Sequence, residues 1–524
     1  MKNPTWLLTF IVGWFVLAAR LGALGEASES PAQARGDEPA DLAPVVWLER
    51  VVRPAGGAEA DRLPLFKVIA REDLRVRDSE RLIENEPARF TRRLAAWAWR
   101  TFGSSSDWPA ARLAIVLEKG GNYARSGFRL LADGRTEAHP TVPYIILEVD
   151  AQSLSDTLLH EGGHLLHSIA AHNARPETSW SAIVHTTFAV TDPLTALAEG
   201  YAIHFETLLG HYGREPEKQR FYHRVAPAFD LKASRRAEYY APITDLLTFS
   251  QSWARYHAVR DTWPAFAGHV YADNYLRSQF DPARDRSTLK PANAMVASEG
   301  VVASVLFWAV AGLADEAGAR FGQGLDQRQL FSAEQTLLRA LAALPAKSGF
   351  RPDLIDLVSA IGEPGSPARK LALSRFVNVT RGVTARPDFR QKWRTLYYAA
   401  IGLDLEGTKP MFAELDAARD AIVDAAQADP GTLRRGLGPV LAVRAPKVEL
   451  EVKALGEKFP LEFDLNSATA AEWLAAGCDR ATSEQLLNER DARPFVSVGD
   501  FEQRTGRSLA SLGLTPVERS EVYR

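Results

Sequence analysis

The chain has a single cysteine, little net charge and no apolar run long enough for a comfortable membrane span. Cys478 is the only cysteine in 524 residues, so no disulfide can form within the chain and stability must come from a hydrophobic core. The formal net charge of −3 gives no general attraction to nucleic acid or to acidic membranes. At this length two or three domains are expected.

The N-terminal residues are typical of an export signal. Lys2 precedes an apolar run at residues 6–19, which matches a signal-peptide core better than a membrane span. Small residues at 23–25 form a cleavage site, so we expect residues 1–25 to be a signal peptide or, if uncleaved, an N-terminal membrane anchor. Residues 26–41 are polar and read as a linker. The rest of the chain is therefore expected to be exported, either periplasmic or extracellular.

The most informative motif is His160-Glu161-Gly162-Gly163-His164, an HExxH sequence. On a helix, residues i and i+4 project from one face, so His160 and His164 can bind one metal ion. Glu161 lies beside them, where it can reach a water molecule on that ion. Each glycine costs on the order of 1 kcal/mol relative to alanine in a helix, which a packed helix can absorb where small residues leave room. The alternative is a helix with two histidines and no metal.

A catalytic zinc ion normally takes three protein ligands. The metzincin continuation, a glycine and then a histidine, is absent, because His167 and Ala170 occupy those two positions. The other source is a glutamate from a second helix, and Glu199 lies in the apolar stretch ALAEGYA at residues 196–202. Burial of an unpaired carboxylate there would be costly, whereas a metal would keep it ionised.

HEGGH followed by LAEGYA resembles the gluzincin metallopeptidases, whose second motif often reads Glu-Gly-aromatic-Ala. The resemblance covers residues 85–310 loosely and is specific only in the two motifs. It implies that His160, His164 and Glu199 are zinc ligands and that Glu161 is the general base. The expected cofactor is therefore Zn²⁺, and the expected activity is hydrolysis of peptide bonds in peptide or protein substrates.

The chain also departs from known gluzincins at two points. Ile203 stands where the thermolysin-like members have an aspartate after the glutamate. The segment before Glu199 is longer than in thermolysin-like and aminopeptidase-like members, and it contains His185 and Asp192, either as substrate-loop residues or as support for the ligands. The resemblance therefore assigns the general architecture and no particular family within it.

Hydrolysis of this kind needs a further donor for the tetrahedral oxyanion, usually a tyrosine or histidine downstream of the glutamate. The sequence does not choose among six candidates, which are Tyr239, Tyr240, Tyr271, Tyr275, His204 and His269. Asp156 is expected to stabilise the helix N-terminus or to orient a ligand imidazole. His167 is expected to be a neighbour of the site rather than a fourth ligand.

The flanking segments predict an α+β fold. Residues 112–118 and 143–150 are apolar and β-branched and read as strands, while residues 84–102 read as a helix that covers their sheet. In gluzincins an edge strand just before the motif helix binds the substrate backbone by strand addition, and residues 143–150 hold that position. We expect residues 42–215 to form a zincin-like catalytic domain, a small mixed sheet plus the active-site helices.

The next part, residues 216–445, reads as mostly helical and is expected to complete the cleft. Its most apolar piece, residues 299–312, is too short for a membrane span and is predicted to be a buried helix.

The last part, residues 460–524, resembles the helix-hairpin-helix module of competence-type DNA-uptake proteins. The likeness rests on Asp464–Thr469 and Pro494–Phe501 together with the helical segments between them. The hairpin at residues 476–480 has one glycine where the module has two, and its Asp479 would repel a phosphate. From Asp464 onward there are seven Lys and Arg against ten Asp and Glu, whereas a DNA-binding module should be basic. These features disfavour DNA and favour a structural role or a protein partner.

The sequence thus predicts an exported zinc metallopeptidase with an accessory tail. Two alternatives stay open. One is a gluzincin-like fold that has lost its activity and binds proteins of the cell envelope. The other is a DNA-binding or DNA-uptake factor that acts through the C-terminal module. The intact HEGGH motif with Glu199 argues against the first alternative, and the acidity of the tail argues against the second.

Overall fold

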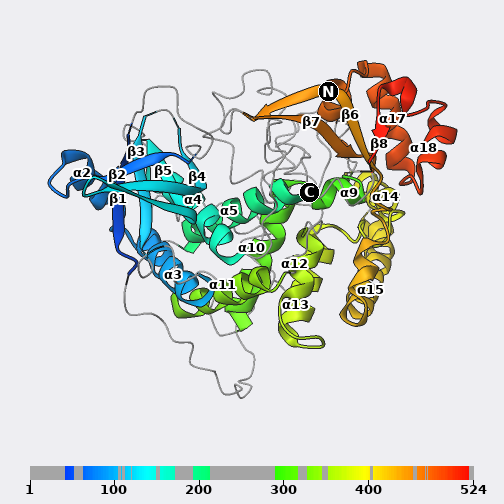
Figure 1. Ribbon diagram of the computed structural model, residues 1–524. Helices are drawn as coiled ribbons and strands as arrows, with labels where there is room; N and C mark the ends of the chain where they lie inside the picture. The colour runs from blue at the N-terminus through cyan, green and yellow to red at the C-terminus, as the bar shows by residue number, and fades with distance from the viewer. Residues whose placement is uncertain are drawn as a thin grey trace, which may run out of the picture. The chain divides into compact units, whose positions relative to one another are not determined.

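The computed structural model describes most of the chain beyond residue 41 (Figure 1). The described residues are 42–51, 63–103, 108, 112–119, 121–148, 154–171, 193–212, 289–316, 327–344, 352–401, 405–452, 457–466, 468 and 470–517. The predicted export signal and linker, residues 1–41, lie outside them. So do seven of the residues considered above: His185, Asp192, Tyr239, Tyr240, Tyr271, Tyr275 and His269. Among the described helices, none is long and apolar enough to cross a membrane.

The chain is a mixed α+β protein, as predicted, but its first sheet is a closed barrel rather than an open sheet. The strands are β1 (Val45–Arg50), β2 (Leu65–Val68), β3 (Leu113–Glu118), β4 (Tyr123–Ala132) and β5 (Arg135–Glu148). They run in the order β1-β2-β4-β5-β3, and β3 pairs with β1 to close the circuit. Parallel and antiparallel pairs alternate around most of it, but the closed five-stranded barrel is not the predicted small mixed sheet.

The hairpin of β4 and β5 contains an irregularity that bends it. Its register shifts between Ser126 and Phe128, where Gly127 alone faces residues 140–142, so the extra residues lie on β5. The φ of Gly127 is +88°, which glycine adopts without strain. A bulge bends the strand and increases its twist, so the long hairpin can pair at different points along its length with β2 and β3. Three strands of the barrel, β1, β2 and β4, were not predicted from the sequence, and without them closure could not be foreseen.

Alternation along the strands separates two cores. Ala114 and Val116 of β3 point into the barrel, where Phe66, Phe128 and Tyr144 pack edge to face or tilted. The intervening residues Leu113, Ile115 and Leu117 face outward and join the core shared with the helices. The barrel is therefore filled by its own side chains and presents an apolar outer face to the helical layer.

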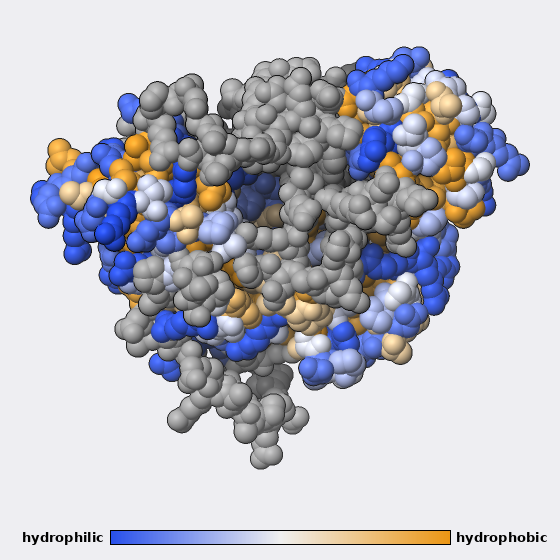
Figure 2. Space-filling view, in the orientation of Figure 1, coloured by the Kyte–Doolittle hydropathy of each residue, from blue (hydrophilic) through white to orange (hydrophobic). Residues whose placement is uncertain are grey.

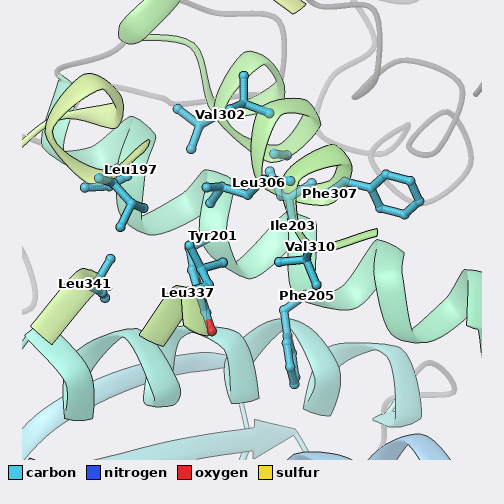
Figure 3. Packing of buried hydrophobic residues seen from close by; sticks show 14 of the residues in the cluster. Leu197, Tyr201, Ile203, Phe205, Val302, Leu306, Phe307, Val310, Leu337 and Leu341 are labelled. Carbon is cyan, nitrogen blue, oxygen red and sulfur yellow. The ribbon is translucent and has the colours of Figure 1, made fainter. Parts of the chain in front are cut away.

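Helices on both sides of strands β3–β5 in the sequence position the candidate site. Between β2 and β3 the chain forms α2 (Leu74–Leu82) and α3 (Glu86–Phe102), and after the barrel come α4 (Leu154–Ala170), α5 (Pro193–Tyr212), α10 (Glu299–Glu316) and α11 (Gln327–Ala342). The predicted helix at 84–102 and the predicted buried helix at 299–312 are both confirmed as α3 and α10. The helix α4 packs against β5, α3 and α5, and α5 packs in turn against α10. Figure 3 shows side chains of α5, α10 and α11 gathered in one apolar cluster.

The two glycines of the HEGGH motif are explained by close helix contacts. A Cβ atom at Gly163 would lie 2.7 Å from the Cα atom of Ala202 on α5, so the two backbones touch there. A Cβ atom at Gly162 would lie 2.7 Å from the Cγ2 atom of Thr91 on α3. On α5, a Cβ atom at Gly200 would collide with Val302 of α10. Small residues are thus required at each crossing, as at other close helix contacts.

The remaining described helices continue the shared core as far as Leu437. They are α9 (Ala292–Val296), α12 (Leu354–Ala360), α13 (Pro367–Val379), α14 (Phe389–Ile401), α15 (Leu405–Ala428) and the short 3₁₀ helix η5 (Pro430–Arg434). The start of α12 is held by Asp353, whose carboxylate caps the helix and also pairs with Arg434 at 2.7 Å.

The C-terminal segment has a core of its own, from Val443 to Leu514. It contains β6 (Ala442–Val452), β7 (Glu457–Asp464), α16 (Ala470–Ala475), α17 (Arg480–Ala492), α18 (Val498–Thr505), the turn η6 (Ala510–Leu512) and β8 (Thr515–Pro516). The strands form a sheet in the order β7-β6-β8. Trp473 packs against Phe463 and Phe501 at its centre. Figure 2 shows both hydrophilic and hydrophobic residues on the visible surface of this segment.

Substitution of Gly163 by alanine tests the close crossing of α4 and α5. Alanine gains about 1 kcal/mol of helix propensity, but the contact with the α5 backbone costs about 1–3 kcal/mol through overpacking. We expect Gly163→Ala to lower the free energy of unfolding, measured by urea denaturation. Gly499→Ala is the matched control, because a Cβ atom there would meet only the Ser497 hydroxyl, at 3.7 Å, and this variant should be neutral or slightly more stable. A Gly163→Ala protein as stable as its parent would contradict the close crossing.

Candidate metal centre

The HEGGH motif lies on one helix, as predicted, with both histidines on the same face. Their ring centroids in α4 are 4.9 Å apart and the ring planes are nearly perpendicular, at 82°. From α5, the Oε2 atom of Glu199 lies 3.6 Å from the Nε2 atom of His160 and 3.2 Å from the Nε2 atom of His164. The structure therefore brings together the three residues that the sequence proposed as ligands.

These three donors fit a zinc ion by both chemistry and spacing. Zinc bonds of about 2.0–2.2 Å in a tetrahedron require donor atoms roughly 3.3 Å from one another, and the two distances to Glu199 agree with this value. Among the described residues, His160, His164 and Glu199 are the one group of three or more such side chains able to hold an ion, with ligand atoms within 4.8 Å of each other. Two imidazoles and one carboxylate also form a donor set that zinc uses in hydrolases.

The carboxyl group of Glu199 on α5 and the imidazole of His160 on α4 shift each other's pKa values. Burial would raise the pKa of Glu199, but His164 and the hydrogen bonds from both imidazoles hold that pKa well below its usual value. Burial would likewise lower the pKa of His160, but hydrogen bonds with Glu199 and Glu206 raise it well above its usual value. The Glu199 carboxylate is therefore ionised, whereas His160 would have to release a proton in order to bind a metal ion.

Glu161 differs from the three candidate ligands in its hydrogen-bond partner, which belongs to the barrel. Its side chain is buried, and burial raises the pKa of this carboxyl group, although His160 and His164 act in the opposite direction. It accepts a hydrogen bond from the backbone amide of Ala124 at the start of β4. A carboxyl group with a raised pKa next to a metal-binding cluster has the properties of a general base.

Glu206 is a site residue that the sequence reasoning missed. Its Oε2 atom lies 3.3 Å from the Nδ1 atom of His160, on the side of the ring opposite Glu199. Metal-binding histidines commonly use their second nitrogen in this way, because a carboxylate there sets the tautomer and the ring orientation. The seven-residue step from Glu199 to Glu206 equals two helical turns, so the sequence held a signal. The position tested instead, Ile203, is buried.

Two other histidines are close to the site without joining it. His167 packs on the ring of Tyr201 with centroids 5.8 Å apart, and burial lowers the pKa of His167 to about 4, so it stays neutral. It lies beside the cluster of His160, His164 and Glu199 and is not one of its members. His204, one of the six oxyanion candidates, is fully buried and hydrogen-bonded to Glu334 at 2.8 Å, so a substrate cannot reach it. The side chain of Asp156 lies outside the described residues.

The strand before the motif helix is not an edge strand, which corrects one expectation. Residues 144–148 of β5 pair with β3, and residues 143–146 pair with β4 on the other side, so both edges are occupied. Among the described residues, the open edge belongs to the first part of β4, because β2 pairs with β4 only over residues 129–131. This part of β4 carries Ala124, whose amide reaches Glu161.

The hairpin of the C-terminal segment is unsuited to phosphate. Helices α16 and α17 are joined by a turn in which Gly477 has a φ of +96°, and Asp479 caps α17. The Asp479 carboxylate accepts a hydrogen bond from the amide of Thr482 at 2.7 Å, and this bond lowers the pKa of Asp479. A carboxylate thus already occupies the helix N-terminus at which a DNA phosphate would bind.

The same segment is attached to the helices through Arg390 of α14. The Arg390 guanidinium donates to the carbonyl oxygen of Leu289 at 3.0 Å and to that of Asp491 in α17 at 2.7 Å. A single side chain therefore connects the start of the described helical region to the C-terminal segment.

Replacement of Glu206 tests whether it supports His160. Glu206→Gln keeps the size of the side chain but removes the charge beside the Nδ1 atom, so we expect zinc affinity to fall about 10- to 100-fold while the fold is retained. Competition with a chelating indicator measures the affinity. The control is Asp424→Asn, which removes an exposed carboxylate paired with Lys370 at 3.0 Å and should leave zinc affinity unchanged. Equal affinities for Glu206→Gln and the parent would remove Glu206 from the site.

Comparison with known proteins assigns the chain to no family, since no protein-family model, no curated protein and no solved structure matches it. The resemblance to gluzincins therefore remains a prediction from two short motifs. The functional conclusion depends on the geometry of the residues described above.

Proposed function

We propose that the protein is a zinc-dependent metallopeptidase of the gluzincin type, in which a zincin-like catalytic domain is built on the barrel and on helices α4 and α5. The observation that carries the proposal is the convergence of two imidazole nitrogens on one carboxylate oxygen, at 3.6 and 3.2 Å. His160, His164 and Glu199 would hold the zinc ion, and Glu206 would orient His160. A fourth position would be left for water or substrate.

The roles of the side chains follow from their surroundings. When bound, zinc lowers the pKa of water and polarises a carbonyl group. The Glu161 carboxylate accepts a proton from the attacking water and delivers it to the leaving amine. Its burial supports this role, because a raised pKa brings the carboxyl group closer to the pKa values of the groups with which it exchanges a proton. The hydrogen bond from Ala124 keeps Glu161 turned toward the barrel side of the site.

The open edge of β4 supports a peptide as the substrate. An extended peptide can add to a free strand edge through main-chain hydrogen bonds, a mode that needs no particular side-chain sequence. The first residues of β4, from Tyr123 to Ser126, have β5 on one side only among the described strands. Because Ala124 in this stretch contacts Glu161, a peptide bound there would pass beside the general base.

The cellular setting follows from the sequence. The export signal at residues 1–25 supports a periplasmic or extracellular location, with residues 6–19 as a membrane tether if the signal is retained. The capped hairpin at Asp479 supports a protein partner for the C-terminal segment rather than DNA.

Two substitutions separate metal binding from catalysis. Glu161→Gln should bind zinc like the parent and hydrolyse peptides about 10²- to 10⁴-fold more slowly, because an amide cannot accept the proton. Glu199→Ala should lose most of the zinc, because a ligand is removed. Zinc content by atomic emission and cleavage of a mixed peptide library measure the two effects.

The parent serves as the reference in both measurements and should contain about one zinc ion per chain. A folded, zinc-supplied parent without bound metal would refute the proposal. An active Glu161→Gln protein would refute the role of the base and leave the metal site intact.

A further inference from the structure

Three polar side chains form a fully buried cluster behind the candidate metal centre. Tyr201, His204 and Glu334 each have none of their surface exposed. The Oε1 atom of Glu334 lies 2.8 Å from the Nε2 atom of His204, and the Tyr201 hydroxyl donates to the Oε2 atom of Glu334 at 3.4 Å. Both oxygens of the carboxylate are thereby used.

The cluster joins a third helix to the helix of the ligand glutamate. Glu334 belongs to α11, whereas Tyr201 and His204 belong to α5 and lie between Glu199 and Glu206 in the sequence. Tyr201 also packs against His167 of α4, with ring centroids 5.8 Å apart. One side chain of α11 therefore contacts α5 midway between its two site carboxylates, 130 residues away from His204 in the sequence.

Hydrogen bonds can add a direction to the packing of α5. Close contacts at Ala202 and Gly200 set how near this helix lies to its neighbours. The described side chains of the helix are buried on nearly every face, among them Leu197, Phe205 and Leu208. Apolar contacts of this kind are not directional, and cores of similar volume tolerate different apolar packings. Directional hydrogen bonds to a buried carboxylate are satisfied in only one rotation.

The cluster also lowers the stability of the core through one unsatisfied polar atom. The Nδ1 atom of His204 is buried and has no hydrogen-bond partner among the described residues. An unsatisfied buried polar atom is unfavourable, and apolar side chains of similar volume often serve a core as well or better. The polar groups therefore point to a purpose other than stability.

We propose that Glu334 is a positioning residue for the metal centre. Its hydrogen bonds to His204 and Tyr201 set the rotation of α5 and thereby direct Glu199 and Glu206 toward the two histidines of α4. The inference rests on the proposed zinc site, and it assigns to α11, a helix that contributes no ligand, control over the geometry of the ligands.

The first test uses Glu334→Gln in the full-length chain. The amide keeps the shape of the side chain but changes the hydrogen bonds to His204 and Tyr201, so α5 loses its preferred rotation. We expect zinc affinity, measured against a chelating indicator, to fall about tenfold. The visible absorption of the cobalt-substituted protein should also change, because it reports ligand geometry. The matched control is Leu337→Ala on the same helix, which should lower the melting temperature and leave zinc affinity and the cobalt spectrum unchanged.

The second test replaces all three polar groups with apolar ones, as Glu334→Leu, His204→Leu and Tyr201→Phe together. If the cluster positions α5, this variant should melt at or above the temperature of the parent and still bind zinc at least tenfold more weakly. Parent-like zinc affinity and cobalt spectra in both Glu334→Gln and the apolar variant would overturn the inference while leaving the zinc site in place. A parent that binds no zinc would overturn the proposed function itself, and with it the inference.

Discussion

The candidate metal centre depends on the close crossing of α4 and α5. At Gly163 the backbone of α4 touches α5 at Ala202, with no side chain between them. Only at this separation can the carboxylate of Glu199 reach the nitrogens of two histidines on the other helix. The glycines weaken α4 as an isolated helix by about 1 kcal/mol each, so the helix relies on burial between the barrel, α3 and α5. The glycines of the HEGGH motif are therefore required by the same close helix crossing that brings Glu199 to the two histidines.

Three glutamates at the site share the same chemistry and are distinguished by their surroundings. Glu199 contacts both imidazoles, which favour its ionised form. Glu206 contacts the far nitrogen of His160 and can influence a metal only through that ring. Glu161 faces the barrel, where burial raises its pKa and the Ala124 amide is its partner. The environment thus gives the three carboxyl groups the different properties that the proposed roles of ligand, support and base require.

The pairing within the barrel decides which strand has a free edge to which a peptide substrate could bind. Because β5 pairs with β3 on one side and with β4 on the other, the strand that leads into α4 has neighbours on both sides. The register shift beside Gly127 lies between the part of β4 that pairs with β2 and the part with one open edge. The open part includes Ala124, whose backbone amide is hydrogen-bonded to Glu161. A curved sheet with one short open edge also leaves little backbone exposed to unwanted strand pairing.

Local spacing along the chain was sufficient to predict the motif helix and the pairing of His160 with His164, because a helix places residues at known angles over one or two turns. The choice of Glu199 came instead from its apolar surroundings in the sequence and from the resemblance of LAEGYA to the second gluzincin motif. It was not sufficient for the closed barrel, the open edge of β4 or the buried Glu334. Those depend on contacts such as that between His204 and Glu334, 130 residues apart in the sequence. Helix geometry is set by neighbours in the chain, whereas the faces that meet are set by how the whole core packs, and periodicity carries no record of that choice.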